Sequence, residues 1–536
     1  MWGRKFYKIA AWNGTATALV ALTGVAGARA DDLQANQRLL DQRIDQLAAV
    51  GQNPGTGAVF SVDQNKAAGS PVSPGSFPRS ILIPGTDTSI KIYGQITEVL
   101  DYWMTGGNPN GSPQSTTVGD NGQVQAIPLR ATGGAARARS NGIFQQSPRE
   151  SKMGIETRTP TPFGEARTVF EFDWAGSTAF APGGTGPVAI SDNLVPRLRY
   201  AYGTLGGFLA GQATSNFSDP DANNETLDFG GNVGDPGHVR VAQIRYTMPA
   251  GWGTSFSVSA ETPETQIATP VGLEASDAGV IPTATTSCPF PAVASATATA
   301  TTCSTTLLGS GSTPLNVAKA TAPDFTAAWY IPQPWGHLDF SAVLLPSIDA
   351  TDGRFFAKQY IGYGGHFGMD IKPGWFGWVK DDITFHFVAG DTIGSFLNSS
   401  SNFQLATNYG TPSTSATTGT YGGFNVPATA AGAANIIFKP TQEMGGNIGY
   451  QHWWADNLRS NINGGINAHY GIPIKLVGAG QAAAINKEII TAHANLIWNP
   501  VSFVDIGIEY TWGQRTVLNN QTGTQNVLIS KFGFRF

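Results

Sequence analysis

Apolar and polar residues alternate with a period of two along most of this chain. The clearest case is the C-terminal segment 526–536, where Phe532, Phe534 and Phe536 alternate with Lys531, Gly533 and Arg535. Because alternate residues of a strand point to opposite faces, the segment predicts a strand with one aromatic and one cationic face. Such a strand is typical of the wall of an outer-membrane barrel. The alternative is an edge strand of a soluble β-sandwich, where an exposed aromatic row invites aggregation.

The same alternation predicts fifteen further strands, with ends uncertain by a few residues. The sixteen predicted strands are 88–103, 149–159, 163–175, 195–205, 206–216, 238–248, 252–261, 323–331, 335–345, 356–368, 381–391, 441–455, 457–470, 486–498, 501–514 and 525–536.

The connections between these strands alternate in length. Short turns such as 159–164 and 248–253 alternate with long linkers, of which 262–322 is the longest. One end of the sheet therefore carries tight turns and the other carries loops, as in outer-membrane barrels, whose turns face the periplasm and whose loops face outwards. We predict an all-β fold: a 16-stranded antiparallel transmembrane β-barrel with a short N-terminal periplasmic coiled-coil helix.

Composition supports this fold class. Only 13% of the 536 residues are charged, yet hydrophobic residues make up an ordinary 41%. After the N-terminus no apolar run is long enough for a membrane helix, and a membrane protein built without such runs must close its backbone hydrogen bonds in a barrel. The formal net charge of -5 gives no basic bias, so nucleic acid is not an expected partner.

The N-terminal segments predict export. Residues 1–30 combine a basic start, an apolar stretch and the small-residue site Ala28-Arg29-Ala30, which is typical of a cleaved signal peptide; the alternative is a retained helical anchor. Residues 31–50 show heptad-like apolar spacing, which predicts a periplasmic coiled coil or an amphipathic surface helix. Residues 51–82 read as a flexible linker before a barrel at 83–536.

Two cysteines, Cys288 and Cys303, lie in one Ser/Thr/Ala-rich stretch. Because an exported chain meets an oxidising compartment, we expect a disulfide that closes this loop. Two thiols alone are a poor metal site, and no cofactor or metal site is predicted.

The polar faces of the predicted strands carry more cations than carboxylates, although the whole chain is net acidic. A water-filled lumen tolerates these charges, whereas a packed core would not. A positive lumen would concentrate anions; alternatively, the charges pair across strands and leave no field. The candidate pore-lining cations are Lys152, Arg158, Arg167, Arg197, Arg199, Arg245 and Arg459.

The linker after the fifth strand is acidic. Its candidate constriction residues are Asp219, Asp221, Glu225 and Asp228. In sixteen-stranded outer-membrane channels the third long loop folds into the barrel, so we expect these carboxylates to face Arg167, Arg197 and Arg199 across the narrowest point. The alternative is a plain exposed acidic loop.

The first long loop carries Arg130, Arg137 and Arg139 among small residues. These cations would receive anions at the pore mouth, or they would contact the phosphates of lipopolysaccharide. The sequence leaves both interpretations open.

Several stretches resemble the DcaP-type porins. The matching runs are IPGTDTSIKIYG at 83–94, SKMGI at 151–155, TPTPFG at 159–164, RLRYAYG at 197–203, LAGQ at 209–212 and QIRYT at 243–247. The resemblance is dense from about 83 to 261 and continues as a general barrel pattern to Phe536. It implies a homotrimer of sixteen-stranded barrels in the outer membrane of a Gram-negative bacterium, an N-terminal periplasmic coiled coil and uptake of small anions such as dicarboxylates.

We therefore expect passive diffusion of small hydrophilic anions and no enzymatic activity. The partners expected with this function are outer-membrane lipid and lipopolysaccharide, small anionic solutes, and the barrel-assembly machinery, which would read the C-terminal Phe536. The alternatives are a general non-selective porin and a structural outer-membrane protein or adhesin. An outer-membrane hydrolase is disfavoured because no histidine stands beside a serine in a recognisable motif.

Overall fold

The computed structural model describes the residues that build the barrel and part of its loops. They are residues 73–107, 127, 129, 141–176, 195–234, 236, 239–269, 272–275, 318–351, 356–397, 403–408, 419–421, 424–426, 436–482 and 485–536. The predicted signal peptide at 1–30, the predicted helix at 31–50 and most of the linker at 51–82 lie outside the described residues.

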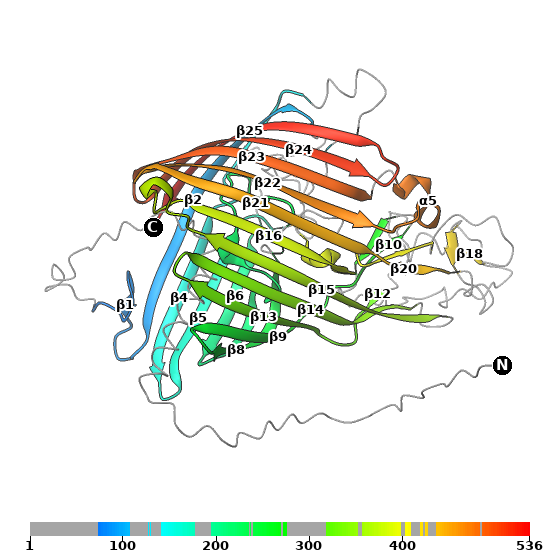
Figure 1. Cartoon of the computed structure of the whole chain (residues 1–536). Helices are drawn as coiled ribbons and strands as arrows, with labels where there is room; N and C mark the ends of the chain where they lie inside the picture. The colour runs from blue at the N-terminus through cyan, green and yellow to red at the C-terminus, as the bar shows by residue number, and fades with distance from the viewer. Residues whose placement is uncertain are drawn as a thin grey trace.

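In the described part of the chain, sixteen antiparallel strands close into a barrel (Figure 1). These strands are β2 (Ser89–Thr105), β4 (Lys152–Thr161), β5 (Gly164–Asp173), β6 (Arg197–Leu205), β7 (Phe208–Thr214), β8 (Arg240–Ala250), β9 (Thr254–Glu261), β13 (Asp324–Gln333), β14 (Gly336–Thr351), β15 (Ala357–Ile371), β16 (Asp382–Asp391), β21 (Gln442–Ala455), β22 (Leu458–Tyr470), β23 (Asn486–Val501), β24 (Val504–Val517) and β25 (Thr522–Arg535). Each corresponds to one predicted strand, so the predicted 16-stranded antiparallel barrel is confirmed.

The barrel closes where its first and last strands meet. β2 pairs antiparallel with β25, with Ile96 opposite Phe534. Beyond the ladder, Phe536 N–H donates to Gly94 O at 3.1 Å and Gly94 N–H donates to Phe536 O at 3.3 Å. Closure leaves no free sheet edge, which is the condition for a sheet to cross a bilayer.

The second barrel strand is interrupted. β3 (Ile143–Ser147) and β4 both pair with β2, and Pro148 to Ser151 separate them. The apolar–polar alternation predicted β4 but not β3, because Pro148 lacks the backbone N–H that a continuous ladder needs.

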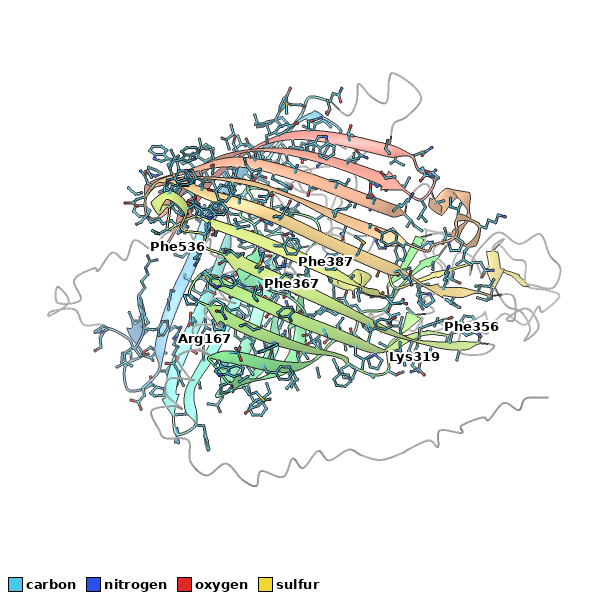
Figure 2. All side chains as sticks on the ribbon, viewed as in Figure 1. Arg167, Lys319, Phe356, Phe367, Phe387 and Phe536 are labelled. Atoms are coloured by element: carbon cyan, nitrogen blue, oxygen red, sulfur yellow. The ribbon has the colours of Figure 1, made fainter. Side chains whose placement is uncertain are left out.

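The outer face of the barrel is apolar. Outward side chains such as Ile244 (66% exposed) and Ile462 (67% exposed) alternate with buried inward residues. Phe367 and Phe387 pair across β15 and β16 on this outer face, as Figure 2 shows. A polar inner face and an apolar outer face fit a wall between water and lipid.

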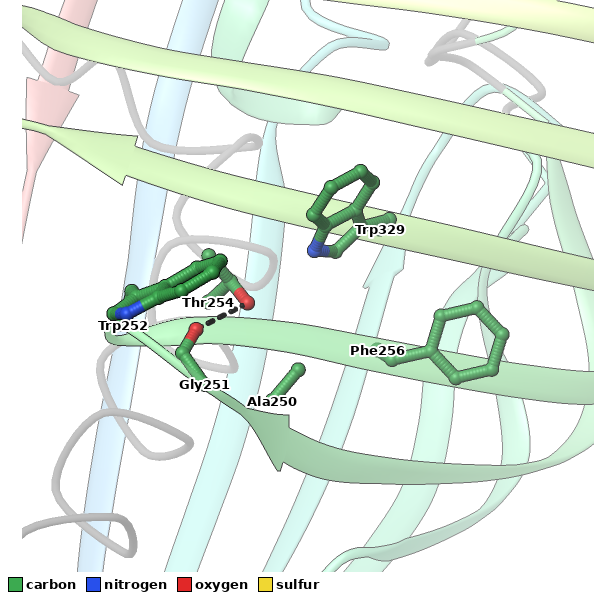
Figure 3. A pocket seen from close by; sticks show the side chains of 6 residues that line it. All are labelled: Ala250, Gly251, Trp252, Thr254, Phe256 and Trp329. Atoms are coloured by element: carbon green, nitrogen blue, oxygen red, sulfur yellow. Dashed lines mark hydrogen bonds between the residues drawn. The ribbon is translucent and has the colours of Figure 1, made fainter.

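Near the short-turn end, the outer face carries aromatic residues. An apolar groove of about 540 Å³ lies at the β8–β9 turn, where Trp252, Phe256 and Trp329 line it (Figure 3). Thr254 Oγ1 donates to Gly251 O at 2.9 Å and fixes the turn. Because these side chains belong to the apolar outer surface, the groove lies outside the lumen.

Smaller elements gather at the barrel end opposite the C-terminus (Figure 1). One sheet contains β10 (Gln266–Thr269), β11 (Gly272–Ala275), β17 (Leu405–Thr407) and β20 (Phe438–Pro440); the other elements are β18 (Gly419–Tyr421), β19 (Phe424–Val426), η6 (Gly394–Phe396) and α5 (Ile474–Ala482). Among the described residues, no helix is long and apolar enough to cross a membrane.

These elements form a cap that packs on one side of the barrel. Phe396 and Leu405 of the cap belong to one buried apolar cluster with Val343 of β14 and Val388 of β16. Phe403, Leu476 and Val477 form a second cluster. The cap therefore covers the inner face of β14 and β16 at this end of the barrel.

Candidate functional site

The inner face of the barrel has two walls of different chemistry. The first, which we call the arginine wall, consists of the inward residues of β4, β5, β6 and β8. The second, the docking wall, consists of the inward residues of β14–β16 and β21–β24. Residues 215–234, which follow β7 and which we call the inward segment, lie inside the barrel and follow the docking wall.

On the arginine wall, ion pairs link neighbouring strands. Arg167 Nε lies 2.8 Å from Glu156 Oε1, and Arg158 Nη2 lies 2.7 Å from the same oxygen. Arg199 Nε lies 2.7 Å from Glu171 Oε1. All of these side chains point inwards because they occupy alternate positions of β4, β5 and β6.

Asp173 joins two of the predicted pore-lining arginines. Arg197 Nη2 lies 2.6 Å and Arg199 Nη1 lies 2.8 Å from Asp173 Oδ2. A register shift between Glu171 and Phe172 in the β5–β6 pair accompanies this shared contact. The side chain of Arg197 is 40% exposed, whereas that of Asp173 is fully buried. Arg197 therefore presents positive charge to the lumen.

Two further predicted cations lie on the same wall. Lys152 is buried on β4 and stands opposite Asp173 in the ladder. Arg245 is buried on β8, opposite Ser259 of β9 and Leu209 of β7. Together with Arg158, Arg167, Arg197 and Arg199, these residues outnumber the inward carboxylates of β4 and β5, which are Glu156, Glu165, Glu171 and Asp173.

The inward segment begins by binding to β9. Ser215 Oγ donates to Glu261 Oε2 at 2.6 Å, and the backbone N–H of Asn216 donates to Glu261 Oε1 at 2.8 Å. Phe217 follows and is fully buried, with its ring 5.3 Å from that of Phe396. The segment is therefore turned towards the docking wall and the cap.

Asp219 binds the docking wall through a histidine. His337 Nε2 of β14 lies 2.7 Å from Asp219 Oδ2, and both side chains are buried. Burial would raise the pKa of Asp219, but the facing His337, helped by His386 and His366, holds it well below its usual value. The short helix η4 (Pro220–Ala222) follows, with half-buried Asp221 in it.

Glu225 makes the densest contacts of the segment. Arg459 of β22 donates to its two carboxylate oxygens from Nε and Nη2, both at 2.6 Å. Next to it, Asn224 Nδ2 donates to Asn447 Oδ1 at 2.8 Å. Arg459 is fully buried under the segment. The prediction that Arg459 lines the pore is therefore wrong, because the Glu225 carboxylate covers and neutralises it.

The tip of the segment reaches β24. The backbone N–H groups of Leu227 and Asp228 donate to the carboxylate of Glu509, at 2.7 and 3.3 Å. Asp228 is buried, and its Oδ1 accepts from the Gly230 backbone at 2.8 Å. Burial, reinforced by the charge of Glu509 and opposed by His493, raises the pKa of Asp228 to about 6.

Glycines in the docking wall make room for the segment. A Cβ atom at Gly368, Gly449 or Gly507 would collide with Asp219, Asn224 or Leu227 respectively, and one at Gly465 would collide with the Val233 carbonyl. Sequence reasoning missed these positions. Inward glycine in the middle of a strand is a signal of close backbone approach and could have revealed them.

The expected pairing across the lumen is wrong for two of the acidic residues. Glu225 pairs with Arg459 and Asp219 with His337, whereas Arg197 and Arg199 pair with Asp173. The reason is proximity, since each group finds an opposite charge on its own side. The segment meets Arg197 through Phe229, whose ring centre lies 5.2 Å from the guanidinium carbon.

Other predicted site residues lie outside the described residues. They are Arg130, Arg137 and Arg139 of the first loop and the Cys288–Cys303 pair.

Known proteins share this architecture. A family described as "Porin subfamily" matches residues 81–472, and one described as "DcaP outer membrane protein" matches residues 441–534. No curated protein matches the chain. The crystal structure of the outer membrane channel DcaP of Acinetobacter baumannii is 18% identical, with a TM-score of 0.57 over 84% of this chain and 97% of that one. An anion-selective porin from Comamonas acidovorans is 7% identical, with a TM-score of 0.42 over 84% and 100%.

The first family match covers well over half of the chain, and the second covers its last five strands, β21 to β25. The fold of the DcaP channel is also the fold described here. The chain therefore belongs to the porin subfamily, with C-terminal strands of the DcaP type, and is an outer-membrane channel protein.

Proposed function

We propose that this porin conducts small hydrophilic anions, dicarboxylates among them, by passive diffusion between the arginine wall and the inward segment. The observation that supports this proposal is the unequal charge of the two walls. The segment's Glu225 cancels Arg459 on the docking wall, whereas cations outnumber carboxylates on the arginine wall. A surplus of one sign along a narrow aqueous path concentrates the opposite ion.

The expected size of the effect follows from Coulomb's law. A unit charge about 8 Å from a permeating ion changes its energy by about 0.5 kcal/mol in water-like dielectric, which alters its local concentration about twofold. A small surplus of cations over carboxylates therefore gives a clear but modest preference for anions. Weak attraction also lets the solute leave the channel.

Reversal potentials in a salt gradient test this proposal. The purified protein in planar bilayers should prefer chloride over potassium, and Arg197→Ala should lower that preference about twofold. Arg197 is the better first target because Asp173 keeps Arg199 when Arg197 is removed. A channel without preference would support the general non-selective porin instead, and the absence of conductance would support a structural protein or adhesin.

The proposed assembly is a homotrimer in the outer membrane, with outer-membrane lipid and lipopolysaccharide around the apolar outer face. The proposed N-terminal helix would lie in the periplasm. Phe536, which closes the barrel against Gly94, is the proposed signal for the barrel-assembly machinery. Cross-linking of the native protein, followed by electrophoresis without heating, tests the trimer.

A further inference from the structure

The ion pair between Glu225 and Arg459 has features of a built anchor. Arg459 lies on β22 with a fully buried side chain, and Glu225 has a side chain that is 7% exposed. Two parallel contacts of 2.6 Å join them. This two-pronged geometry fixes orientation as well as distance, which a single contact between point charges does not.

The remaining polar atoms of the pair are also engaged. Arg459 Nη1 donates to Asn499 Oδ1, and its guanidinium carbon lies 5.2 Å from the ring centre of Trp453. Glu225 Oε2 accepts from Gln451 Nε2 at 2.8 Å. Buried charges stabilise a structure only when such partners offset their lost hydration. This site meets that condition.

The backbone at Glu225 is held at the same place. Its carbonyl oxygen accepts from Asn495 Nδ2 at 3.0 Å and from Asn463 Nδ2 at 3.4 Å. Three adjacent strands, β21 to β23, therefore hold one residue of the segment through its side chain and its backbone. Glu225 lies between the two outer anchors, at Asp219 and at Leu227. Without the middle anchor, the span between them can bow into the lumen or along it.

The pair also has an electrostatic consequence. Arg459 finds its carboxylate on the inward segment, whereas Arg199 finds its carboxylates on its own wall. Loss of either partner therefore leaves a net charge in the lumen. Loss of Glu225 leaves a cation, and loss of Arg459 leaves an anion.

We infer that Glu225 and Arg459 together determine both the width and the charge of the constriction. The pair positions the inward segment, and Glu225 neutralises the positive charge of Arg459. Arg459 acts as a positioning residue in this role. The inference relies on the lumen being the conducting path, but it does not depend on an anion preference of the unmodified channel.

Substitutions that replace one charged member of the pair with neutral glutamine test the inference. Glu225→Gln and Arg459→Gln should both raise single-channel conductance and current noise, because each loosens the segment. Their reversal potentials should shift in opposite directions, Glu225→Gln towards anions and Arg459→Gln towards cations, each by about a twofold change in the permeability ratio. The double variant should keep the raised conductance and return the reversal potential to that of the unmodified channel.

Glu165→Gln is the matched control. Glu165 pairs with Arg158 on the arginine wall at 3.4 Å. Within the described residues, it has no hydrogen bond or ion pair with the inward segment. This variant should shift the reversal potential towards anions without the rise in conductance. Arg459→Lys keeps the charge but loses the two-pronged contact, so it should raise conductance with little change in selectivity. It also serves if Arg459→Gln does not fold.

Unchanged conductance in both single variants would overturn the positioning role. Shifts of reversal potential in the same direction would overturn the electrostatic role. Cation preference in the unmodified channel would overturn the proposed function, yet it would leave the opposite shifts of the two variants in place.

Discussion

Charged residues serve different purposes on the two walls of the lumen. On the arginine wall, charges pair with neighbours on adjacent strands, as Arg199 does with Glu171 and Asp173, and Arg197 remains 40% exposed. On the docking wall, polar and charged groups form their hydrogen bonds and ion pairs with the inward segment, as Arg459 does with Glu225. The same residue type therefore offers charge to solute on one side and holds a loop on the other. Inward position in a strand does not by itself make an arginine a pore-lining residue.

The largest expected effect comes from breaking the arginine wall. Arg199→Ala leaves Asp173 paired with Arg197 but removes the arginine that pairs with Glu171, whose side chain is fully buried. Leaving buried charge without compensation costs about 3 to 5 kcal/mol. Urea unfolding of the refolded protein in detergent, followed by tryptophan fluorescence, should show a loss of that size.

Arg158→Ala is the control for this experiment. Its partner Glu156 keeps Arg167 at 2.8 Å, so the loss of unfolding free energy should stay within about 1 kcal/mol. Equal losses of unfolding free energy in the two variants would contradict the difference between Glu156, which keeps Arg167 as a second partner, and Glu171, which loses Arg199.

The next largest effect comes from the glycines of the docking wall that make room for the inward segment. Gly368→Ala places a methyl group against Asp219 and should push the segment off the wall. Overpacking of this kind costs about 1 to 3 kcal/mol. Because the segment bounds the path, single-channel conductance should change. Gly365→Ala on the same strand meets nothing within 4 Å and should behave like the unmodified channel. If the two variants conduct alike, the close approach at Gly368 does not position the segment.

A smaller effect should follow from pH at the tip of the segment. Burial raises the pKa of Asp228 from 3.8 to about 6, so the folded segment favours the protonated form. The contribution of Asp228 to the stability of the tip is therefore most favourable below pH 4, falls between about pH 4 and 6, and stays low above that range. Current noise should rise across the same interval. Asp228→Asn should remove this dependence, and an unaltered pH profile in that variant would exclude Asp228 as its source.

The smallest expected effect concerns the contact between the segment and the arginine wall. Phe229→Ala removes a ring that lies 5.2 Å from the Arg197 guanidinium. A partly exposed contact of this type contributes roughly 0.5 to 1 kcal/mol. Conductance should change less than in Gly368→Ala. A larger change would mean that Phe229, rather than the docking wall, holds the segment in place.

The strands of the barrel were predictable because each repeats an apolar–polar alternation over many residues. In β24, for example, exposed Ile508 and Tyr510 alternate with buried Glu509 and Thr511, as the pattern predicted. β3 was missed because Pro148 breaks the second strand. Local sequence thus contained nearly all the information that the barrel wall needed.

The partners of the inward segment were not predictable in the same way. Glu225 and Arg459 are 234 residues apart, and nothing near either residue indicates the other. Charge alone suggested that Glu225 would meet Arg197 or Arg199, which have closer partners on their own wall. A glycine on an inward strand position, as at Gly449, is the one local sign that the loop would lie there.

In the proposed function, the open path carries a surplus of positive charge because Asp219 and Glu225 of the inward segment pair with His337 and Arg459 of the docking wall. The reversal potential of the unmodified protein in a potassium chloride gradient tests it most directly. If the path carries surplus positive charge, the potential lies on the chloride side of zero. A potential on the potassium side would contradict it.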